Sequence, residues 1–262
     1  MMNHQKLLNK KIVISAAADG IGWSIADYCM NNGATVYLSD ININKLSLLK
    51  GHKNYNKTLF LENVKTNDPE SVLNYSLELK DNISSIDCLI NNVGISGPTG
   101  KIEDLKIDEW KNTIDVNINS HFYFSKYFIP LMKKNGGSII NLSSTAGLFG
   151  FPLRSPYAAS KWAIIGLTKS LAMELGKFNI RVNAVCPGSV SGDRMKRVIE
   201  AKAKSMGLSE KKLQKDFESM TSLNSFVDKE DIANSVIFLL SDEAKKISGQ
   251  VMSIDGNTER MN

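Results

Sequence analysis

The amino-acid sequence predicts an α/β fold, in which helices cover both faces of a parallel β-sheet. The first observation is that short β-branched runs alternate with segments of helical pattern along the whole 262-residue chain. The second is that several of these runs are apolar almost throughout, which is typical of strands buried on both faces. No internal repeat or low-complexity tract interrupts the alternation. We therefore expect a doubly wound, Rossmann-type sheet of about seven strands.

The expected strands are short and bounded by polar or turn-forming residues. They are KIVIS from Lys11, TVYLSD from Thr35, TLFLEN from Thr58, IDCLINN from Ile86, SIINLSS from Ser138, IRVNAVC from Ile180 and GQVMSID from Gly249. In a sheet of this type, ligands bind in the crevice beyond the carboxyl ends of the strands. We therefore expect functional residues to cluster at those ends.

Five segments between the strands carry the clearest helical pattern. They are Ile21 to Asn32, Pro69 to Lys80, Ile107 to Lys134, Tyr157 to Leu175 and Lys229 to Leu240. Asp68 and Asp228 directly precede two of them. An acidic residue in that place accepts main-chain hydrogen bonds at the start of a helix, so both are predicted N-caps.

Composition indicates an ordinary globular protein, with 42% hydrophobic and 23% charged residues. No linker-like stretch divides the chain, so we expect residues 1–262 to form one domain. Cys29, Cys88 and Cys186 are odd in number and far apart, which argues against disulfides or a thiolate metal site and favours a reducing compartment. The N-terminus lacks a secretory signal, and no apolar run approaches the roughly 20 residues that cross a bilayer. We expect a soluble, cytoplasmic protein that does not bind membranes.

The net charge is +5, and the basic residues are spread out except between Lys196 and Lys215. That stretch has helical apolar spacing and interleaved glutamates, and it lacks the aromatic residues that stack on nucleic-acid bases. We interpret it as a solvated helix face rather than a nucleic-acid-binding patch.

The segment SAAADGIG, Ser15 to Gly22, lies between the first predicted strand and the first predicted helix. This order places main-chain N–H groups and the positive helix end against a pyrophosphate, although an ordinary βα turn is the alternative. Gly20 and Gly22 allow close approach to phosphates and packing of helix on strand. Ala16 replaces the first glycine, and its methyl group is tolerable only with a negative φ, which we expect.

Asp40 ends the second strand about twenty residues after the turn, where a carboxylate accepts hydrogen bonds from an adenosine ribose and repels a 2′-phosphate. Asp19 adds a second negative charge nearby, and no Arg or Lys occupies either place. Both residues favour NAD over NADP. An acidic strand end is also explained simply by the preference of Asp for turns.

Tyr157 and Lys161 are four residues apart at the start of a predicted helix, so they share one face. A free phenol has a pKa near about 10, and a neighbouring ammonium lowers that pKa toward the range useful for general acid–base catalysis. Ser144 closes a strand thirteen residues before Tyr157. Its hydroxyl can polarise a carbonyl or hold an alkoxide while hydride moves to or from a cofactor.

In this order, along nearly the whole chain, these motifs resemble those of the classical short-chain dehydrogenase/reductase family. The family's glycine motif corresponds to SAAADGIG, its Asn-Asn-Ala-Gly motif to Asn91–Gly94, its catalytic Asn to Asn117, its Ser to Ser144, its Tyr-x-x-x-Lys to Tyr157 and Lys161, and its Pro-Gly to Pro187 and Gly188. The resemblance makes Tyr157 the general acid–base and gives Lys161 a hydrogen bond to the nicotinamide ribose. It also implies that Ser144 orients the substrate oxygen and that Asn117 holds a water in a proton relay. Considered alone, Asn117 is simply a polar helix residue.

The same resemblance implies the residues that surround the NAD cofactor. They are Ser15, Asp19, Gly20, Ile21, Gly22, Asp40, Asn63, Val64, Asn91, Val93, Gly94, Tyr157, Lys161, Pro187, Gly188 and Val190. Asn63 and Val64 fall beside the adenine, and the Asn63 amide can still accept a hydrogen bond there. Val93 replaces an Ala. Gly192 replaces a Thr that contacts the carboxamide, so that group must be held mainly by main chain around Val190.

The substrate side is less constrained by the sequence. The family places its substrate lid over 189–225, and Arg154, three residues before Tyr157, can pair with a carboxylate, sulfonate or phosphate of the substrate. Alternatively, Arg154 bridges to main chain or to another subunit. His121, one turn after Asn117, is expected to be a packed helix residue rather than a metal ligand, and no metal is expected.

We therefore expect an NAD-dependent enzyme that interconverts a secondary alcohol and a carbonyl on a small polar substrate, either an anionic hydroxy compound or a sugar derivative. The resemblance implies a homotetramer or homodimer, in which helices beginning near Leu105 and Tyr157 pack between subunits. One alternative is a reductase of 3-oxoacyl groups on a carrier protein, whose usual NADPH is opposed by Asp40 and Asp19. The other is a nucleotide-sensing protein without catalysis, which is opposed by the presence of all four catalytic residue types.

Overall fold

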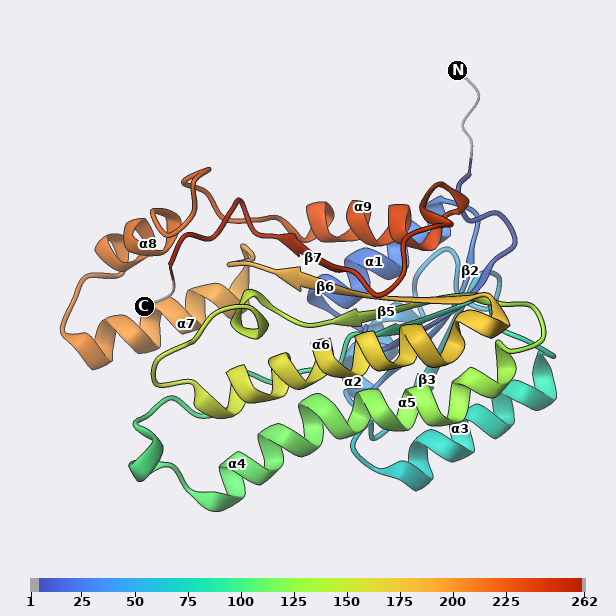
Figure 1. Ribbon diagram of the computed structural model, residues 1–262, viewed down its shortest axis with the longest axis horizontal. Coiled ribbons are helices and arrows are strands. Elements are labelled where there is room, and N and C mark those ends of the chain that lie inside the picture. The colour runs from blue at the N-terminus through green and yellow to red at the C-terminus, as the bar shows by residue number, and fades with distance from the viewer. Residues whose placement is uncertain (1–4, 261–262) are drawn as a thin grey trace.

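The computed structural model of the chain describes residues 5–260; within the helix Asp193–Met206 it describes the main chain but not the side chains at 194, 201, 202 and 204–206. A parallel seven-stranded sheet has the order β3-β2-β1-β4-β5-β6-β7 (Figure 1). The strands are β1 Lys11–Ser15, β2 Thr35–Asp40, β3 Leu59–Asn63, β4 Cys88–Asn91, β5 Gly137–Leu142, β6 Ile180–Pro187 and β7 Val251–Ile254. The expected doubly wound fold is confirmed.

Helices cover both faces of this sheet (Figure 1). The helices are α1 Gly20–Asn31, α2 Ile43–Leu49, α3 Pro69–Asn82, α4 Ile107–Ile114, α5 Ser120–Phe128, α6 Ser155–Leu175, α7 Asp193–Met206, α8 Glu210–Glu218 and α9 Lys229–Leu240. Short 3-10 turns lie at Ile102–Asp104, Ile129–Leu131, Thr145–Gly147, Gly176–Phe178 and Asp242–Ala244. None of the helices within residues 5–260 is long and apolar enough to span a membrane.

In the inner strands, alternate residues enter two separate cores, which explains why these strands are apolar on both faces. Ile12 and Ile14 of β1 face the core shared with α1 and α9. Val13, between them, faces the core that contains Phe124 and Phe128 of α5. The expected N-caps are also confirmed: Asp68 accepts the Glu70 N–H at 3.1 Å, and Asp228 forms a capping box at the start of α9.

Two expectations about helices were wrong. The segment Ile107 to Lys134 is not one helix: a π-helical turn, Asp115–Asn119, separates α4 from α5, and a 3-10 turn containing Pro130 follows. The proline lacks an N–H, so it cannot continue the α-helical ladder. The sequence reading also missed α2, whose N-cap Asn42 accepts the Lys45 N–H at 3.1 Å.

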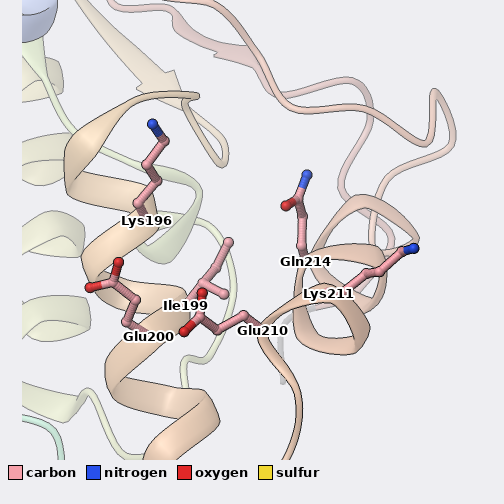
Figure 2. Close-up of a pocket in the computed structure, with 6 residues that line it drawn as sticks. All are labelled: Lys196, Ile199, Glu200, Glu210, Lys211 and Gln214. Carbon is pink, nitrogen blue, oxygen red and sulfur yellow. The ribbon is translucent and has the colours of Figure 1, made fainter.

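The segment expected as a lid forms the helical pair α7 and α8, which follows the carboxyl end of β6. This pair has a small core of its own, which includes Ile199, Leu213 and Phe217. The cleft between the two helices is lined by Lys196, Ile199, Glu200, Glu210, Lys211 and Gln214 (Figure 2). Lys196, Lys211, Lys212 and Lys215 are exposed, as expected for a solvated face.

Candidate active site

The residues singled out in the sequence do gather at the carboxyl ends of the strands. Ser15 ends β1, Asp40 ends β2 and Asn91 ends β4. Ser144 lies two residues beyond β5, and Pro187 ends β6. Because all these strands are parallel, their ends meet at one edge of the sheet, where the start of α6 also lies.

Tyr157 and Lys161 lie one turn apart on α6. The Lys161 Nζ atom is 5.8 Å from the centre of the Tyr157 ring. Lys161 is only 4% exposed, and its Nζ donates to the Leu142 main-chain oxygen at 2.9 Å. Ser144 stands between the end of β5 and the following turn, where its Oγ accepts the Ala146 N–H at 3.2 Å. The site thus combines a buried ammonium, a half-buried phenol and a strand-end hydroxyl.

Asn117 is fully buried in the π-helical turn between α4 and α5. Its Oδ1 accepts the Ile95 N–H at 2.8 Å, and its Nδ2 donates to the Ile95 oxygen and to the Ser160 Oγ, each at 3.0 Å. Ser160 in turn donates to the Tyr157 main-chain oxygen at 2.7 Å. The Asn117 side chain therefore fixes the loop after β4 to the start of α6. π-helical turns of this kind occur frequently at functional sites.

Arg154 lies against the phenol of Tyr157. Its Nη2 donates to the Ser96 main-chain oxygen at 2.7 Å. Its Cζ is 5.5 Å from the centres of both the Phe151 and the Tyr157 rings. The main-chain bridge considered for this residue is thus present, and the guanidinium is fixed beside the candidate acid–base.

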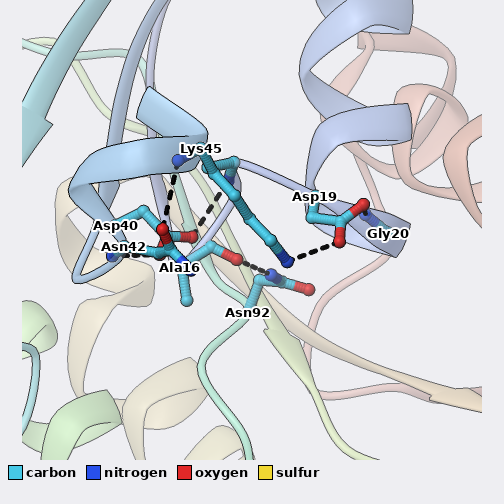
Figure 3. Close-up of polar contacts among 8 residues, drawn as sticks. Ala16, Asp19, Gly20, Asp40, Asn42, Lys45 and Asn92 are labelled. Atoms are coloured by element: carbon cyan, nitrogen blue, oxygen red, sulfur yellow. Dashed lines mark hydrogen bonds and ion pairs between the residues drawn. The ribbon is translucent and has the colours of Figure 1, made fainter. Parts of the chain in front are cut away.

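The phosphate-binding turn departs from expectation at Ala16, whose φ is 51° rather than negative. The left-handed conformation places the methyl group against the following carbonyl, at a cost of about 1–2 kcal/mol. Asn92 holds this conformation, because its Nδ2 donates to the Ala16 oxygen at 2.8 Å (Figure 3). The same Nδ2 lies 3.3 Å from the Ser15 oxygen. The Asn92 side chain therefore stabilises a left-handed conformation that alanine otherwise adopts only at a cost.

The remaining glycines fit a cofactor cradle. A Cβ at Gly22 would lie 2.7 Å from the Ala17 Cα, so only glycine allows α1 to pack this closely on the turn. Gly20 has a φ of 58°, and a Cβ there would have no atom within 4 Å, so the turn is open on that side. A Cβ at Gly94 would lie 3.2 Å from the Lys161 Nζ. These observations fit a turn that can hold the pyrophosphate of a dinucleotide.

Two carboxylates flank the turn (Figure 3). Asp40 accepts the Ala18 N–H at 3.0 Å and the Asn42 N–H at 2.9 Å, which fixes its position at the end of β2. Asp19 forms a 2.6 Å ion pair with Lys45 of α2, and this hydrogen bond is the main reason why the pKa of Asp19 is lowered. The sequence has no Arg or Lys at these two positions, but the fold brings Lys45 to Asp19 from α2, a helix that was not predicted. The repulsion between Asp19 and a 2′-phosphate is therefore weaker than its charge alone indicates.

The other candidate cofactor residues differ in whether their side-chain atoms can still contact a ligand. Asn63 uses its Nδ2 on the Asp40 and Ile41 oxygens, so its Oδ1 is the atom that can meet an adenine. Asn91 is fully buried, and its Nδ2 donates to the Asn141 Oδ1 at 2.8 Å, so its side chain serves the sheet rather than the crevice. Val64 and Val93 are also buried.

The segment after β6 is built from main-chain contacts. A Cβ at Gly188 would lie 2.8 Å from the Asp255 Cα, so the chain passes close to the segment after β7. Ser191 donates to the Val227 oxygen and Val227 donates to the Ser189 oxygen, in a bridge that uses none of the main-chain groups of Val190. Gly192 has a φ of 122°, where a threonine would be strained.

Comparison with known proteins agrees with this geometry. A family model described as enoyl-(acyl carrier protein) reductase matches residues 16–257. The trans-4-hydroxycyclohexanecarboxylate dehydrogenase of Sinomonas cyclohexanicum is 36% identical over 259 residues, covering 96% of this chain and 93% of the relative. A 3-oxoacyl-acyl-carrier-protein reductase of Thermotoga maritima is 34% identical over 253 residues, covering 96% and 98%. A solved NAD⁺-bound xylitol dehydrogenase has a TM-score of 0.91 at 27% identity, covering 96% and 100%.

The fold, the cradle at its first turn and these relatives together define an oxidoreductase that acts on CH–OH groups of a small molecule with a nicotinamide cofactor. The chain belongs to the short-chain dehydrogenase/reductase family.

Proposed function

We propose that this protein is an NAD-dependent dehydrogenase that interconverts a secondary alcohol and a ketone on a small, carboxylate-bearing substrate. The observation that carries the proposal is the placement of the Tyr157 ring 5.8 Å from the buried Lys161 ammonium, at the edge of the sheet where Ser144 follows β5. A phenol and an ammonium so placed suit proton transfer to and from an alcohol oxygen.

The nicotinamide, when bound, supplies the acceptor or donor of hydride. In the oxidation direction, the Ser144 hydroxyl holds the alcohol oxygen and the Tyr157 phenolate takes its proton. The Lys161 ammonium favours that phenolate, because an adjacent positive charge in a buried site stabilises the anion. In the reduction direction, the Tyr157 phenol returns the proton to the carbonyl oxygen. The pair α7 and α8 covers the substrate and excludes water.

The preference for NAD rests mainly on Asp40. Its carboxylate is held at the end of β2 by two main-chain N–H groups, so it cannot easily turn away from a 2′-phosphate. Its charge opposes NADP and its oxygens suit the ribose hydroxyls of NAD. Asp19 contributes less than the sequence alone indicates, because Lys45 neutralises part of its charge.

The substrate class rests on Arg154. Its Cζ lies 5.5 Å from the centre of the Tyr157 ring, and its Nη2 donates to the Ser96 oxygen, so its positive charge is fixed beside the candidate acid–base. A carboxylate a few ångströms from the reacting carbon would meet this guanidinium. The most similar relative reported above is named for a hydroxy acid of this kind.

The experiment that tests the function measures reduced nicotinamide optically while hydroxy acids, polyols, hydroxysulfonates and 3-hydroxyacyl thioesters are offered with NAD or NADP. We expect hydroxy acids to react with NAD, and Tyr157→Phe to lower kcat by about 100-fold or more, because the general acid–base is lost. Arg154→Ala should raise KM for hydroxy acids alone. A Tyr157→Phe variant as active as wild type would overturn the dehydrogenase.

The relative from Thermotoga maritima keeps a second candidate function open, reduction of 3-oxoacyl groups on a carrier protein. Rapid NADPH oxidation with a 3-oxoacyl thioester, and none with NADH, would establish that function in place of the hydroxy-acid dehydrogenase.

We also propose that the chain is one catalytic domain, works as a homotetramer and resides in the cytoplasm. Buried thiols at Cys29, Cys88 and Cys186 suit a reducing compartment.

A further inference from the structure

Arg154 occupies a position at the start of α6 where a positive charge is unfavourable. It is the N-cap residue of this helix, and the first turn, residues 155–158, contains no acidic side chain. A guanidinium has no acceptor atom, so it cannot cap the main-chain N–H groups of that turn. These groups carry partial positive charge, and a cation beside them is destabilising. Residues that break a local rule in this way are expected at functional sites.

The main chain around Arg154 holds its guanidinium in one place. The Nη2 atom donates to the Ser96 oxygen, in the loop after β4, at 2.7 Å. Leu153, the preceding residue, has a φ of 63°, a left-handed conformation that is strained for leucine. Its oxygen accepts the N–H of Gly100, from the same loop after β4, at 2.9 Å. Two contacts therefore join this loop to the segment that carries the guanidinium.

Two cations lie at similar distances from the Tyr157 ring. The Arg154 Cζ is 5.5 Å from the centre of that ring, and the Lys161 Nζ is 5.8 Å from it. Tyr157 is half-buried, so water screens these charges less than it would at an exposed site. An opposite charge within about 4–6 Å lowers the pKa of an acidic group by about 1–3. At this distance the guanidinium favours a phenolate on Tyr157, as the ammonium does.

Other titratable groups near the Lys161 ammonium are uncharged. His121 of α5 is fully buried, and Cys186 of β6 is buried as well; the charge of Lys161 acts on both. Burial lowers the pKa of His121 to about 3 and raises the pKa of the Cys186 thiol. Asp255, after β7, is the carboxylate that acts on Cys186, and its oxygens accept main-chain N–H groups of its own segment. Neither the imidazole nor the thiol therefore supplies a negative charge that would offset the two cations.

We propose that Arg154 acts on the reaction through Tyr157: its guanidinium is a second cation, beside the Lys161 ammonium, that stabilises the phenolate. The proposal rests on the dehydrogenase function proposed above, and it gives Arg154 a role with every alcohol, whether or not the substrate carries a carboxylate. In oxidation, the hydride of the alcohol passes to the cofactor and its hydroxyl proton passes to the phenolate. The phenol then loses this proton to solvent before the next cycle. Arg154 keeps its own protons throughout, because a guanidinium is not deprotonated in proteins.

The first test titrates the phenol directly, in the full chain before cofactor or substrate is added. The ultraviolet absorbance of phenolate is followed against pH, and the titration of Tyr157→Phe is subtracted to isolate Tyr157. Arg154→Gln removes the charge but keeps an N–H donor for the Ser96 oxygen, and Arg154→Lys keeps the charge. We expect the midpoint to rise by about 1 pH unit or more in Arg154→Gln and to stay close to wild type in Arg154→Lys.

Lys177→Gln is the matched control, because it also removes a cation beside an aromatic ring. The Lys177 Nζ is 5.3 Å from the centre of the Phe178 ring, in the 3-10 turn that follows α6. The midpoint of this variant should equal that of wild type. A wild-type midpoint in Arg154→Gln would overturn the proposal. Equal rises in Arg154→Gln and Lys177→Gln would also overturn it, because the cause would be net charge, and equal rises in Arg154→Gln and Arg154→Lys would assign the effect to geometry instead.

The second test measures kcat against pH for a hydroxy acid and for its uncharged amide. In Arg154→Gln, kcat should reach its plateau about 1 pH unit higher than in wild type with either substrate, which corresponds to about tenfold slower turnover on the acidic limb. KM should rise for the hydroxy acid only. A role of Arg154 in structure alone would lower kcat equally at all pH values and would leave the profile where it is in wild type.

The outcomes separate the two proposals. If Arg154→Gln raises KM for hydroxy acids but leaves the phenol titration and the pH profile as in wild type, Arg154 serves the substrate alone. This inference is then overturned and the dehydrogenase stands. If Tyr157→Phe retains full activity, the dehydrogenase function is overturned, and the role of Arg154 in the reaction falls with it. The titration would then report only whether the guanidinium stabilises the phenolate.

Discussion

The conformation of Ala16 has a measurable energetic consequence. Replacing Ala16 by Gly relieves about 1–2 kcal/mol of left-handed strain, while the added freedom of glycine in the unfolded chain offsets roughly 0.5–1 kcal/mol. We therefore expect Ala16→Gly to raise the free energy of unfolding by about 0.5–1 kcal/mol in urea denaturation. Asn92→Ala should lower it by about 1–2 kcal/mol, because the amide that holds the Ala16 oxygen is lost. A destabilised Ala16→Gly protein would show that φ at this position is negative after all.

The buried imidazole also predicts how stability depends on pH. The pKa of His121 is lowered to about 3 in the folded protein, whereas a histidine in an unfolded chain titrates near about 6.5. Between these values the unfolded state binds the extra proton, so the free energy of unfolding falls as pH decreases, by up to about 1.4 kcal/mol per pH unit. His121→Phe removes this titration, and its stability should fall less steeply from about pH 6 to pH 4. Urea denaturation of both proteins at several pH values checks this, and parallel curves would contradict it.

The positions of single residues were predictable from the sequence where they follow from the spacing of residues within one helix or strand. Tyr157 and Lys161 share a helix face because they are four residues apart, and Asp40 lies at a strand end because β-branched residues precede it. Lys45 and Asn92 were missed, because each acts through a contact with a residue more than twenty positions away. Patterns within a short stretch of sequence do not predict contacts between residues so far apart in the chain.

At the scale of elements, the loop after β4 meets α6 at Gly94. A Cβ there would lie 3.2 Å from the Lys161 Nζ and 3.7 Å from the Asn117 Oδ1, so Gly94→Ala must displace the ammonium slightly. We expect kcat to fall about tenfold with little loss of stability, because small misplacements of a catalytic group are costly. Gly166→Ala is the matched control on α6, since a Cβ there meets nothing within 4 Å. Equal kcat values for Gly94→Ala and Gly166→Ala would refute the argument.

Elements with strong periodicity were predictable, and irregular ones were not. The strands agree with the structure within a few residues at their ends, because their central residues are apolar and the inner strands are buried on both faces. The π-helical turn Asp115–Asn119 was read as ordinary helix, since nothing in its composition opposes an α-helix. Its cause is tertiary: the buried Asn117 side chain holds the main chain of Ile95.

At the scale of the whole molecule, the order of βα units was enough to predict the sheet, because parallel strands joined by helices have few possible arrangements. The oligomeric state was not predictable in this way, because a surface that pairs with its own copy produces no periodic pattern in the sequence. The exposed faces of α5 and α6 carry Phe122, Trp162 and Met173, which are 49%, 50% and 86% exposed. Apolar side chains of this size on neighbouring helices are typical of contacts between subunits.

The proposed tetramer can be tested on these faces. An Asp buried in a subunit contact without a partner costs about 2–5 kcal/mol, which is enough to dissociate a moderately stable interface. We therefore expect the double change Phe122→Asp with Trp162→Asp to lower the mass measured by light scattering to that of a dimer or monomer. Leu48→Asp is the control, because Leu48 is 80% exposed on α2, outside the proposed interface. An unchanged mass in the double variant would show that α5 and α6 face solvent, and a mass that falls with Leu48→Asp alone would move the interface to α2.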